Sequence, residues 1–113
     1  MMTTLPQAGA LAFDKDLKRK ARLFKALAHP ARLAILQYLA EIKTCMTGDI
    51  ADELPLGRTT VNQHLKELKD AGLIRGTVEG VRTNYCLNPS AIHELKEAFS
   101  ALMLDIGDSP SMC

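Results

Sequence analysis

One stretch of the chain combines hydrogen-bonding and cationic side chains at a spacing that suits a DNA groove. Val61, Leu65 and Leu68 fall at intervals of four and three, which predicts a helix with one apolar face. Amide side chains pair with base edges and cations pair with phosphates, so this helix is predicted to enter the major groove of duplex DNA. Its candidate DNA-binding residues are Arg58, Thr59, Thr60, Asn62, Gln63, His64 and Lys66. Of these, His64 adjoins the apolar face, where contact with a phosphate and packing are both open.

Thiols are the other reactive groups, and they are few. Cys45, Cys86 and Cys113 are an odd number at wide spacing, which argues against a disulfide framework and for reduced thiols. The sequence shows no serine–histidine–aspartate triad, cysteine–histidine pair, paired carboxylates or glycine-rich phosphate loop. It therefore predicts a protein that is not an enzyme and uses no cofactor.

The histidines outside the DNA-binding stretch assign no metal site. His29 precedes Pro30 and is interpreted as marking the boundary between two helices, since proline suits a first helical turn. His93 and Glu97 stand one helical turn apart and could hold a metal ion across a dimer. A surface pair at this spacing is far commoner than a metal site.

The elements that must position the DNA-binding face begin with three helices. Asp14 can cap the first helix, and Pro30 begins a second helix that is apolar enough to be the buried centre of the domain. A short strand is expected at 43–46. A third helix follows from Gly48 and ends at the turn 55–57. This helix, the turn and the DNA-binding helix together predict a helix-turn-helix.

Glycines and alternating side chains predict a ribbon after the DNA-binding helix. Gly72 lies where a left-handed residue commonly ends a helix. Residues 73–78 and 81–87 are predicted to pair as the two strands of a hairpin. Arg75 and Arg82 on this ribbon are expected to contact the DNA backbone or the adjacent minor groove.

The last predicted helix carries an apolar stripe suited to pairing with another helix. It begins after Asn88 and closes at Gly107, and its apolar residues follow a spacing of three and four. Together with the stripe of the first helix, it predicts a two-fold dimer. The alternative is that the helix folds back on its own core. The candidate dimerisation residues are Leu17, Phe24, Leu95, Phe99, Leu102 and Ile106.

Length and composition indicate one globular domain. Of the 113 residues, 47 % are hydrophobic and 24 % are charged. Residues 14–107 are assigned to a winged helix DNA-binding and dimerisation domain, 1–13 to a flexible tail and 108–113 to a disordered tail. No apolar run could cross a membrane and no secretory signal is evident, so the expected location is the cytoplasm.

The charge of the chain is nearly balanced but unevenly placed. The net charge is only +1, yet seven basic and two acidic residues lie between Asp14 and Arg32. A local basic surface attracts phosphates whatever the average charge of the protein. The alternative for this run is a solvated helix face.

Three segments carry a family signature in their order and spacing. They read FKALAHPARLAILQYL, IADELPLGRTTVNQHLKELKDAGLI and, at the end of the ribbon, NYCLNP. Over residues 20–106 the chain thus resembles the ArsR/SmtB family of bacterial winged-helix repressors. The resemblance implies a dimer on operator DNA, with a recognition helix at 58–71, a wing at 75–85 and dimerisation through the first and last helices. It also implies release from DNA by a metal ion, a metalloid or a thiol-reactive species.

The chain departs from this family at its metal sites. The two positions of the family's thiolate site fall on Met46 and Gly48, and Cys45 lies one residue earlier. The family's other site falls on Pro89, Ala91, Leu102 and Asp105, so at most one ligand survives. Zinc or nickel is therefore expected to do little.

The cysteines remain as a candidate effector site. In a winged helix, the strand before the helix-turn-helix usually pairs beside the second wing strand, which would bring Cys45 and Cys86 within several ångströms. Arsenite, antimonite or an oxidant could then act on this thiol sensor. The alternative is that both cysteines pack as small hydrophobes, since Cys86 faces away from the core if Tyr85 and Leu87 face it.

These features predict a mainly α fold with a small β-hairpin, arranged as a dimeric winged helix-turn-helix. The predicted function is a sequence-specific DNA-binding transcriptional regulator, a homodimeric repressor released from its operator by a thiophilic metalloid or by cysteine oxidation. Two alternatives stay open: a winged-helix regulator with no effector site, and a winged-helix module that binds protein. The polar and basic residues between Arg58 and Lys66 argue against the protein-binding alternative.

Overall fold

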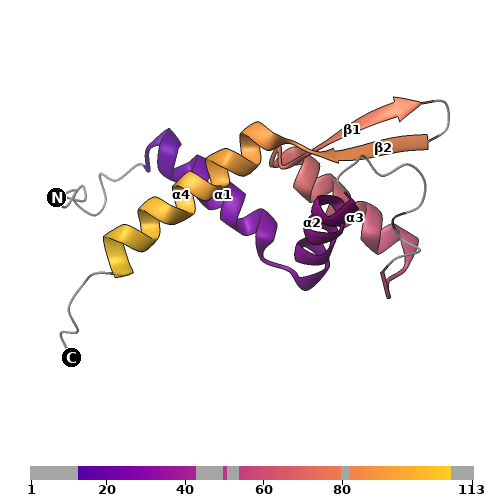
Figure 1. Ribbon diagram of the computed structural model, residues 1–113, viewed down its shortest axis with the longest axis horizontal. Helices are drawn as coiled ribbons and strands as arrows, with labels where there is room; N and C mark the ends of the chain where they lie inside the picture. Colours follow the sequence, from indigo (N-terminus) through magenta and orange to yellow (C-terminus); the bar gives the residue numbers. More distant parts are fainter. Residues whose placement is uncertain (1–12, 43–49, 51–53, 80–81, 108–113) are drawn as a thin grey trace.

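Four helices and a two-stranded hairpin make up the described part of the protein (Figure 1). The computed structural model describes residues 13–42, 50, 54–79 and 82–107. In chain order the elements are α1 (Lys15–Leu27), α2 (Pro30–Ile42), α3 (Arg58–Asp70), β1 (Ile74–Glu79), β2 (Arg82–Leu87) and α4 (Pro89–Gly107). The strand expected at 43–46 and the start of the helix expected from Gly48 lie outside the described residues.

Local side-chain bonds define where the first two helices begin. The Asp14 carboxylate accepts a hydrogen bond from the backbone N–H of Leu17 at 2.8 Å, which confirms Asp14 as the N-cap of α1. At the start of α2, His29 Nδ1 accepts from the backbone N–H of Ala31 at 3.0 Å. His29 therefore caps the helix that Pro30 opens, at the boundary between two helices that the sequence predicts.

The end of α3 is a Schellman turn. Gly72 has a φ of +85°, and its N–H donates to the Lys69 carbonyl at 2.9 Å. The N–H of Leu73 donates to the Leu68 carbonyl at 3.0 Å, and both leucine side chains are fully buried. This pair of bonds with its apolar contact confirms the predicted left-handed cap at Gly72.

The hairpin is close to its predicted position. The two strands are antiparallel, with Ile74 opposite Leu87 and Glu79 opposite Arg82. β1 begins one residue later than predicted because Leu73 is used by the turn that ends α3. Ile74 is buried in the core, whereas Val78 is 71 % exposed. The hairpin thus starts in the core and projects away from it, as a wing does (Figure 1).

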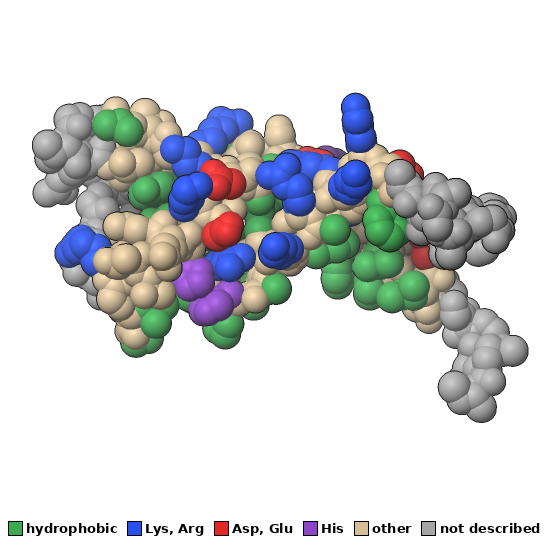
Figure 2. All heavy atoms as spheres, turned by 180° about the vertical axis from the view of Figure 1, so that it is seen from behind, with side chains coloured by type: hydrophobic (Ala, Val, Ile, Leu, Met, Phe, Trp, Pro, Cys, Tyr) green, Lys and Arg blue, Asp and Glu red, His purple; other side chains and the backbone are tan. Residues whose placement is uncertain are grey.

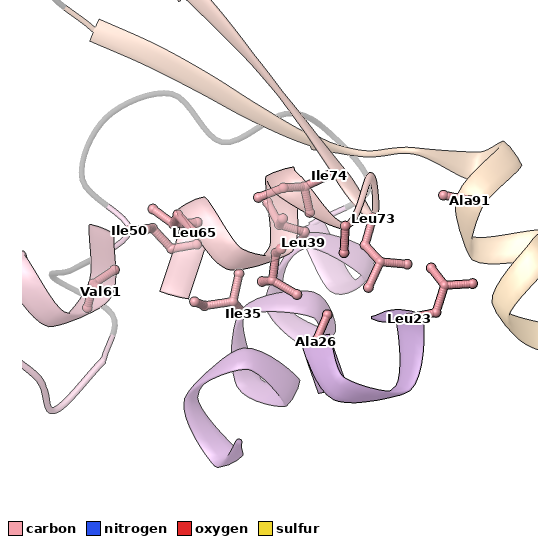
Figure 3. Close-up of a cluster of buried hydrophobic side chains, with 12 residues drawn as sticks. Leu23, Ala26, Ile35, Leu39, Ile50, Val61, Leu65, Leu73, Ile74 and Ala91 are labelled. Atoms are coloured by element: carbon pink, nitrogen blue, oxygen red, sulfur yellow. The ribbon is translucent and has the colours of Figure 1, made fainter. Parts of the chain in front are cut away.

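The core lies where α1, α2, α3 and the base of the hairpin meet (Figure 3). Its largest fully buried side chains are Leu23, Ile35, Leu39, Val61, Leu65, Leu68, Leu73 and Ile74. α2 contacts α1, α3 and β2, in agreement with its predicted central place. Its burial is one-sided, however, because Leu33 on the same helix remains exposed.

α4 leaves the core after its first turns and lies along α1 (Figure 1). The rings of Phe24 and Phe99 meet edge to face, with centroids 6.4 Å apart. Beyond this contact the helix has a large apolar exposure, since Phe99 is 51 % and Ile106 is 55 % exposed. Within one chain, the described core covers the start of the α4 stripe at Leu95 but leaves the later part exposed. None of the described helices combines the length and apolar character needed to cross a membrane.

We expect Gly72→Ala to lower the free energy of unfolding by about 1–2 kcal/mol, because an L side chain strains a left-handed backbone. A Cβ there would meet Arg19 Nη2 at 3.6 Å, an ordinary contact, so the cost is conformational. Urea denaturation measures the change. The matched control is Gly107→Ala, where a Cβ meets nothing within 4 Å. Equal stability of the Gly72 variant and wild type would contradict this description of the turn.

Candidate nucleic-acid interface

α3 has a closed face, which packs against the core, and an open face, which is exposed to solvent. Val61, Leu65 and Leu68 are at most 2 % exposed and fasten the helix to the core. The candidate residues that lie exposed on this helix are Arg58, Thr59, Thr60, Asn62, Gln63 and Lys66. The structure therefore brings six of the seven sequence candidates on α3 to its solvent side.

The first turn of the open face is suited to an anionic partner. Gly57 is the N-cap and, as a glycine, has no side chain to bond the first amide groups of α3. The first turn holds no acidic residue. Amide N–H groups at a helix start carry partial positive charge, which favours phosphate oxygens. The exposed Arg58 lies in the same turn. Cationic and hydrogen-bonding groups thus coincide at this end of α3.

Lys66 is paired on its own helix in the absence of a partner. Its Nζ lies 2.7 Å from an Asp70 carboxylate oxygen. This hydrogen bond raises the pKa of Lys66 and lowers the pKa of Asp70, so both groups stay charged near neutral pH. The pair is exposed, and exposed pairs contribute little to stability. Lys66 can therefore exchange Asp70 for a phosphate at small cost.

His64 does not share the open face. It is only 8 % exposed, and its Nδ1 accepts a hydrogen bond from Arg32 Nε at 3.1 Å. Its ring centroid lies 4.1 Å from that of His29. Of the two roles that the sequence left open for His64, packing is the one this position serves. We therefore leave His64 out of the DNA-contacting set.

Arg32 is the residue at this interface that sequence reasoning missed. Besides His64, it donates through Nη1 to the carbonyls of Lys25 and Ala26 at 3.2 and 3.4 Å. It also lines a depression of about 390 Å³ together with Gln63 and Lys66. The sequence places Arg32 only within the basic run at 14–32. No spacing rule connects it to a helix that begins 26 residues later.

The wing supplies one described candidate cation. Arg75 on β1 is exposed, and its Nη2 donates to Asn88 Oδ1 at 2.9 Å. Arg82 begins β2 opposite Glu79, and its side chain lies outside what the structure describes. Arg75 therefore stands at the base of the wing, tied to the residue that precedes α4.

The candidate thiols differ from the sequence expectation at Cys86. Cys86 lies on β2 opposite Arg75 and is disulfide-bonded, so the expectation of reduced thiols is wrong at this position. An odd number of cysteines at wide spacing does not prevent one pair from meeting after folding. The other two cysteines, Cys45 and Cys113, lie outside the described residues.

The candidate dimerisation residues lie together at the α1 and α4 end of the molecule. Leu17, Phe99, Leu102 and Ile106 are exposed, and Phe24 and Leu95 are half-buried. Figure 2 shows hydrophobic side chains gathered at this end of the face seen from behind.

His93 and Glu97 are exposed on α4. Within the described ranges, no group of three or more histidine, cysteine, aspartate or glutamate residues is placed to hold a metal ion.

Comparisons of sequence place these elements among known regulators. A family described as a helix-turn-helix domain matches residues 27–77, from the end of α1 into β1. The HTH-type transcriptional regulator CmtR of Mycobacterium tuberculosis is 38 % identical over 89 residues, which cover 75 % of each chain. The solution structure of CmtR, described as a cadmium metal-sensor, has a TM-score of 0.50 and covers 82 % of this chain and 96 % of that one.

Solved structures agree with the fold. The ArsR family transcriptional regulator RHA00566 has a TM-score of 0.70 at 22 % identity and covers 89 % of this chain and all of that one. The homodimeric winged helix-turn-helix DNA-binding domain of Mb0332 from Mycobacterium bovis has a TM-score of 0.62 at 25 % identity and covers 91 % of this chain and all of that one. These likenesses confirm the predicted winged helix-turn-helix fold.

Burial also makes His64 sensitive to acid. Burial is the main reason why the pKa of His64 is lowered, because it disfavours the charged ring. Positive charge on His29 and Arg32 lowers this pKa further, and Glu67 raises it weakly. The unfolded chain therefore binds a proton at residue 64 more readily than the folded protein does. Stability gained from neutral His64 is complete above about pH 6.5 and is lost as the pH falls below that value.

We expect His64→Asn to reduce the loss of unfolding free energy between about pH 7.5 and 5.5. Asparagine can still accept from Arg32 through Oδ1 but does not titrate. Urea denaturation at both pH values measures the difference, and His93→Asn on the exposed face of α4 is the matched control. The same pH dependence in the His64 variant and wild type would contradict the assignment.

Proposed function

The chain belongs to the ArsR/SmtB family of winged-helix transcriptional regulators, and from this membership we propose that it is a repressor whose α3 recognises operator DNA. Its relatives are transcription regulators, which confirms the prediction that it is not an enzyme. One observation carries the proposal: α3 is closed by leucine and valine on one side and presents amide, hydroxyl and basic groups on the other. The protein would act where the DNA is, which for a bacterial regulator is the cytoplasm.

The proposed contacts on α3 divide into two kinds. Thr59, Asn62 and Gln63 are assigned to base edges, because asparagine and glutamine can pair bidentately with adenine. Arg58 and Lys66 are assigned to phosphates, where charge matters and base identity does not. This division separates the residues that determine sequence preference from those that determine general affinity.

The wing is proposed to add contacts outside the major groove. Arg75 and Arg82 belong to the two strands of the hairpin, and cations on a narrow ribbon suit the DNA backbone or the minor groove. Arg75 is exposed and stays attached to Asn88 at the base of the ribbon. It can therefore reach only DNA that approaches the base of the wing.

A homodimer through α1 and α4 fits the exposed apolar surface. Phe99, Leu102 and Ile106 project from α4, and Leu17 projects from α1 beside it. Burying each such side chain stabilises an interface by about 1.5–3 kcal/mol. The related Mb0332 domain is described as homodimeric. A two-fold dimer of this chain would bind two half-sites, so the operator would be an imperfect palindrome.

The proposed effector is a thiol reagent that acts at Cys86 with Cys45. The support is that Cys86 is disulfide-bonded and lies opposite Arg75 in the wing. In the oxidative form of the proposal, two thiols lose two protons and two electrons to hydrogen peroxide, which is reduced to two molecules of water. Arsenite or antimonite would instead be bridged by the two thiolates. Either reaction would alter the position of the wing. A change of about 1.4 kcal/mol in the free energy of DNA binding alters affinity about tenfold.

We expect Gln63→Ala to flatten base preference at one position of each half-site, since a bidentate contact discriminates by about 1–3 kcal/mol. Lys66→Ala should weaken binding to all sequences alike and lower the salt slope by about one unit. Selection from random duplexes, followed by titration at several salt concentrations, measures both effects. Wild-type protein that selects no sequence would contradict the proposed function. Two variants that both changed only specificity would contradict the division of roles.

We expect reduced wild-type protein to release its selected duplex on addition of arsenite, antimonite or hydrogen peroxide. Cys86→Ser and Cys45→Ser should bind DNA and resist release, because the remaining member of the Cys45–Cys86 pair can neither form that disulfide nor bridge the metalloid alone. Cys113→Ser is the control and should respond as wild type does. Fluorescence anisotropy of a labelled duplex measures release. Equal release of the doubly substituted protein would show that the effector acts elsewhere.

A further inference from the structure

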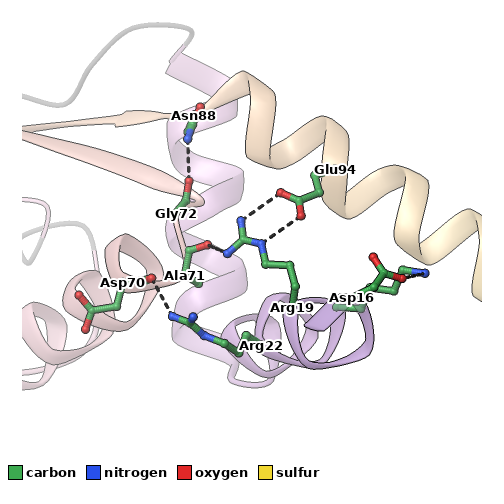
Figure 4. Close-up of polar contacts among 9 residues, drawn as sticks. Asp16, Arg19, Arg22, Asp70, Ala71, Gly72, Asn88 and Glu94 are labelled. Carbon is green, nitrogen blue, oxygen red and sulfur yellow. Dashed lines mark hydrogen bonds and ion pairs between the residues drawn. The ribbon is translucent and has the colours of Figure 1, made fainter. Parts of the chain in front are cut away.

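Three successive carbonyls at the end of α3 each accept a side-chain hydrogen bond from another element (Figure 4). Arg22 Nη2 donates to the Asp70 carbonyl at 3.2 Å, and Arg19 Nη1 donates to the Ala71 carbonyl at 3.1 Å. Asn88 Nδ2 donates to the Gly72 carbonyl at 2.9 Å. Two donors thus come from α1 and one from the junction between β2 and α4. We call these three contacts the C-terminal clamp of α3.

Arg19 is itself held by α4. Its Nε and Nη2 donate to the two carboxylate oxygens of Glu94, both at 3.0 Å. This two-pronged contact raises the pKa of Arg19 and lowers the pKa of Glu94, so both groups remain charged. The planar guanidinium therefore joins α1, α4 and the end of α3 in one fixed geometry. On the other side, Asn88 also accepts from Arg75 of the wing.

The clamp bonds the carbonyls that the turn after α3 leaves open. The Schellman turn at Gly72 already satisfies the carbonyls of Leu68 and Lys69, and Lys69 places a positive charge in the last turn. The next three carbonyls, those of Asp70, Ala71 and Gly72, are satisfied by side chains from outside α3. The donors come from α1 and from Asn88, which directly precedes α4, and α1 and α4 carry the exposed apolar stripe. The clamp thus ties the helix that would contact DNA to the helices that would form the dimer.

The length of α3 makes its orientation sensitive to this end. Its 13 residues span about 20 Å, so a tilt of about 10° at the clamp moves the far end by about 3.4 Å, one base-pair step. The residues assigned to bases lie in the first half of α3, toward the end that is farther from the clamp. A loose clamp would therefore spread their positions over neighbouring base pairs.

We propose that Arg19, Arg22 and Asn88 are positioning residues that fix the tilt of α3 relative to α1 and α4, and so determine the distance between half-sites that the dimer accepts. This inference rests on the proposed function, because it concerns how two copies of α3 bind one operator. It adds a specificity determinant that does not touch DNA. The expected signature is a change in preferred spacing with the base preference of each half-site unchanged.

The test is selection of full-length protein variants on duplexes whose two half-sites are separated by spacers of different length. Arg19→Lys keeps the charge but loses the planar fork, Arg22→Gln weakens the second contact, and Glu94→Gln releases Arg19 from α4. Lys20→Gln is the matched control, since it removes an ion pair with Asp16 that lies within α1. Sedimentation and thermal melting confirm that each variant is a folded dimer.

We expect wild type and Lys20→Gln to bind one spacing about tenfold more tightly than spacings one base pair shorter or longer. Arg19→Lys and Glu94→Gln should reduce this preference to about threefold or less. Variants with wild-type spacing preference, or with equal loss of affinity at every spacing, would overturn the inference and leave the clamp a purely structural feature. Wild-type protein that selects no paired half-sites would contradict the dimeric DNA-binding function as well.

Discussion

The one-sided burial of α3 is the constraint on which the rest of the structure depends. Val61, Leu65 and Leu68 lie against α2 and the base of the hairpin, almost without exposure. Because successive helical residues turn by about 100°, rotating α3 by one residue would bury Asn62 or expose Leu65. The core therefore determines which side chains face DNA, although no core residue contacts it. Polar residues can occupy the open face because stability comes from the closed one.

Rotation about its own axis is only one of the motions that α3 must resist. The apolar stripe sets this rotation, the bond between Arg32 and His64 attaches the middle of the helix to α2, and the clamp at Asp70 to Gly72 attaches its end to α1 and α4. Bidentate contacts with bases tolerate small errors only, so tilt and rotation both bear on recognition. The polar contacts are individually weak as sources of stability. Their importance is that they hold α3 in one orientation relative to the other helices.

The features that could be predicted from the sequence are local ones. The helical period of α3, the cap at Asp14 and the glycine at position 72 each show in a few neighbouring residues, and the structure confirms them. The bond between Arg19 and Glu94 joins residues 75 positions apart, and periodicity indicates which face is buried without naming its partner. His64 lies three residues after Val61, so the helical period allows its packing, but the partner of its ring, Arg32, lies 32 positions earlier and only the fold brings the two together. The oxidation of Cys86 likewise depends on a contact made only on folding.

In the proposed complex, two copies of α3 in one dimer bind successive turns of the major groove on one side of an operator. Hydroxyl-radical footprinting on a duplex selected by the wild-type protein tests it most directly. We predict two protected patches on the same face of the DNA, with centres about 10 base pairs apart and related by a two-fold axis. A single patch, or protection spread evenly along the duplex, would contradict the paired use of α3.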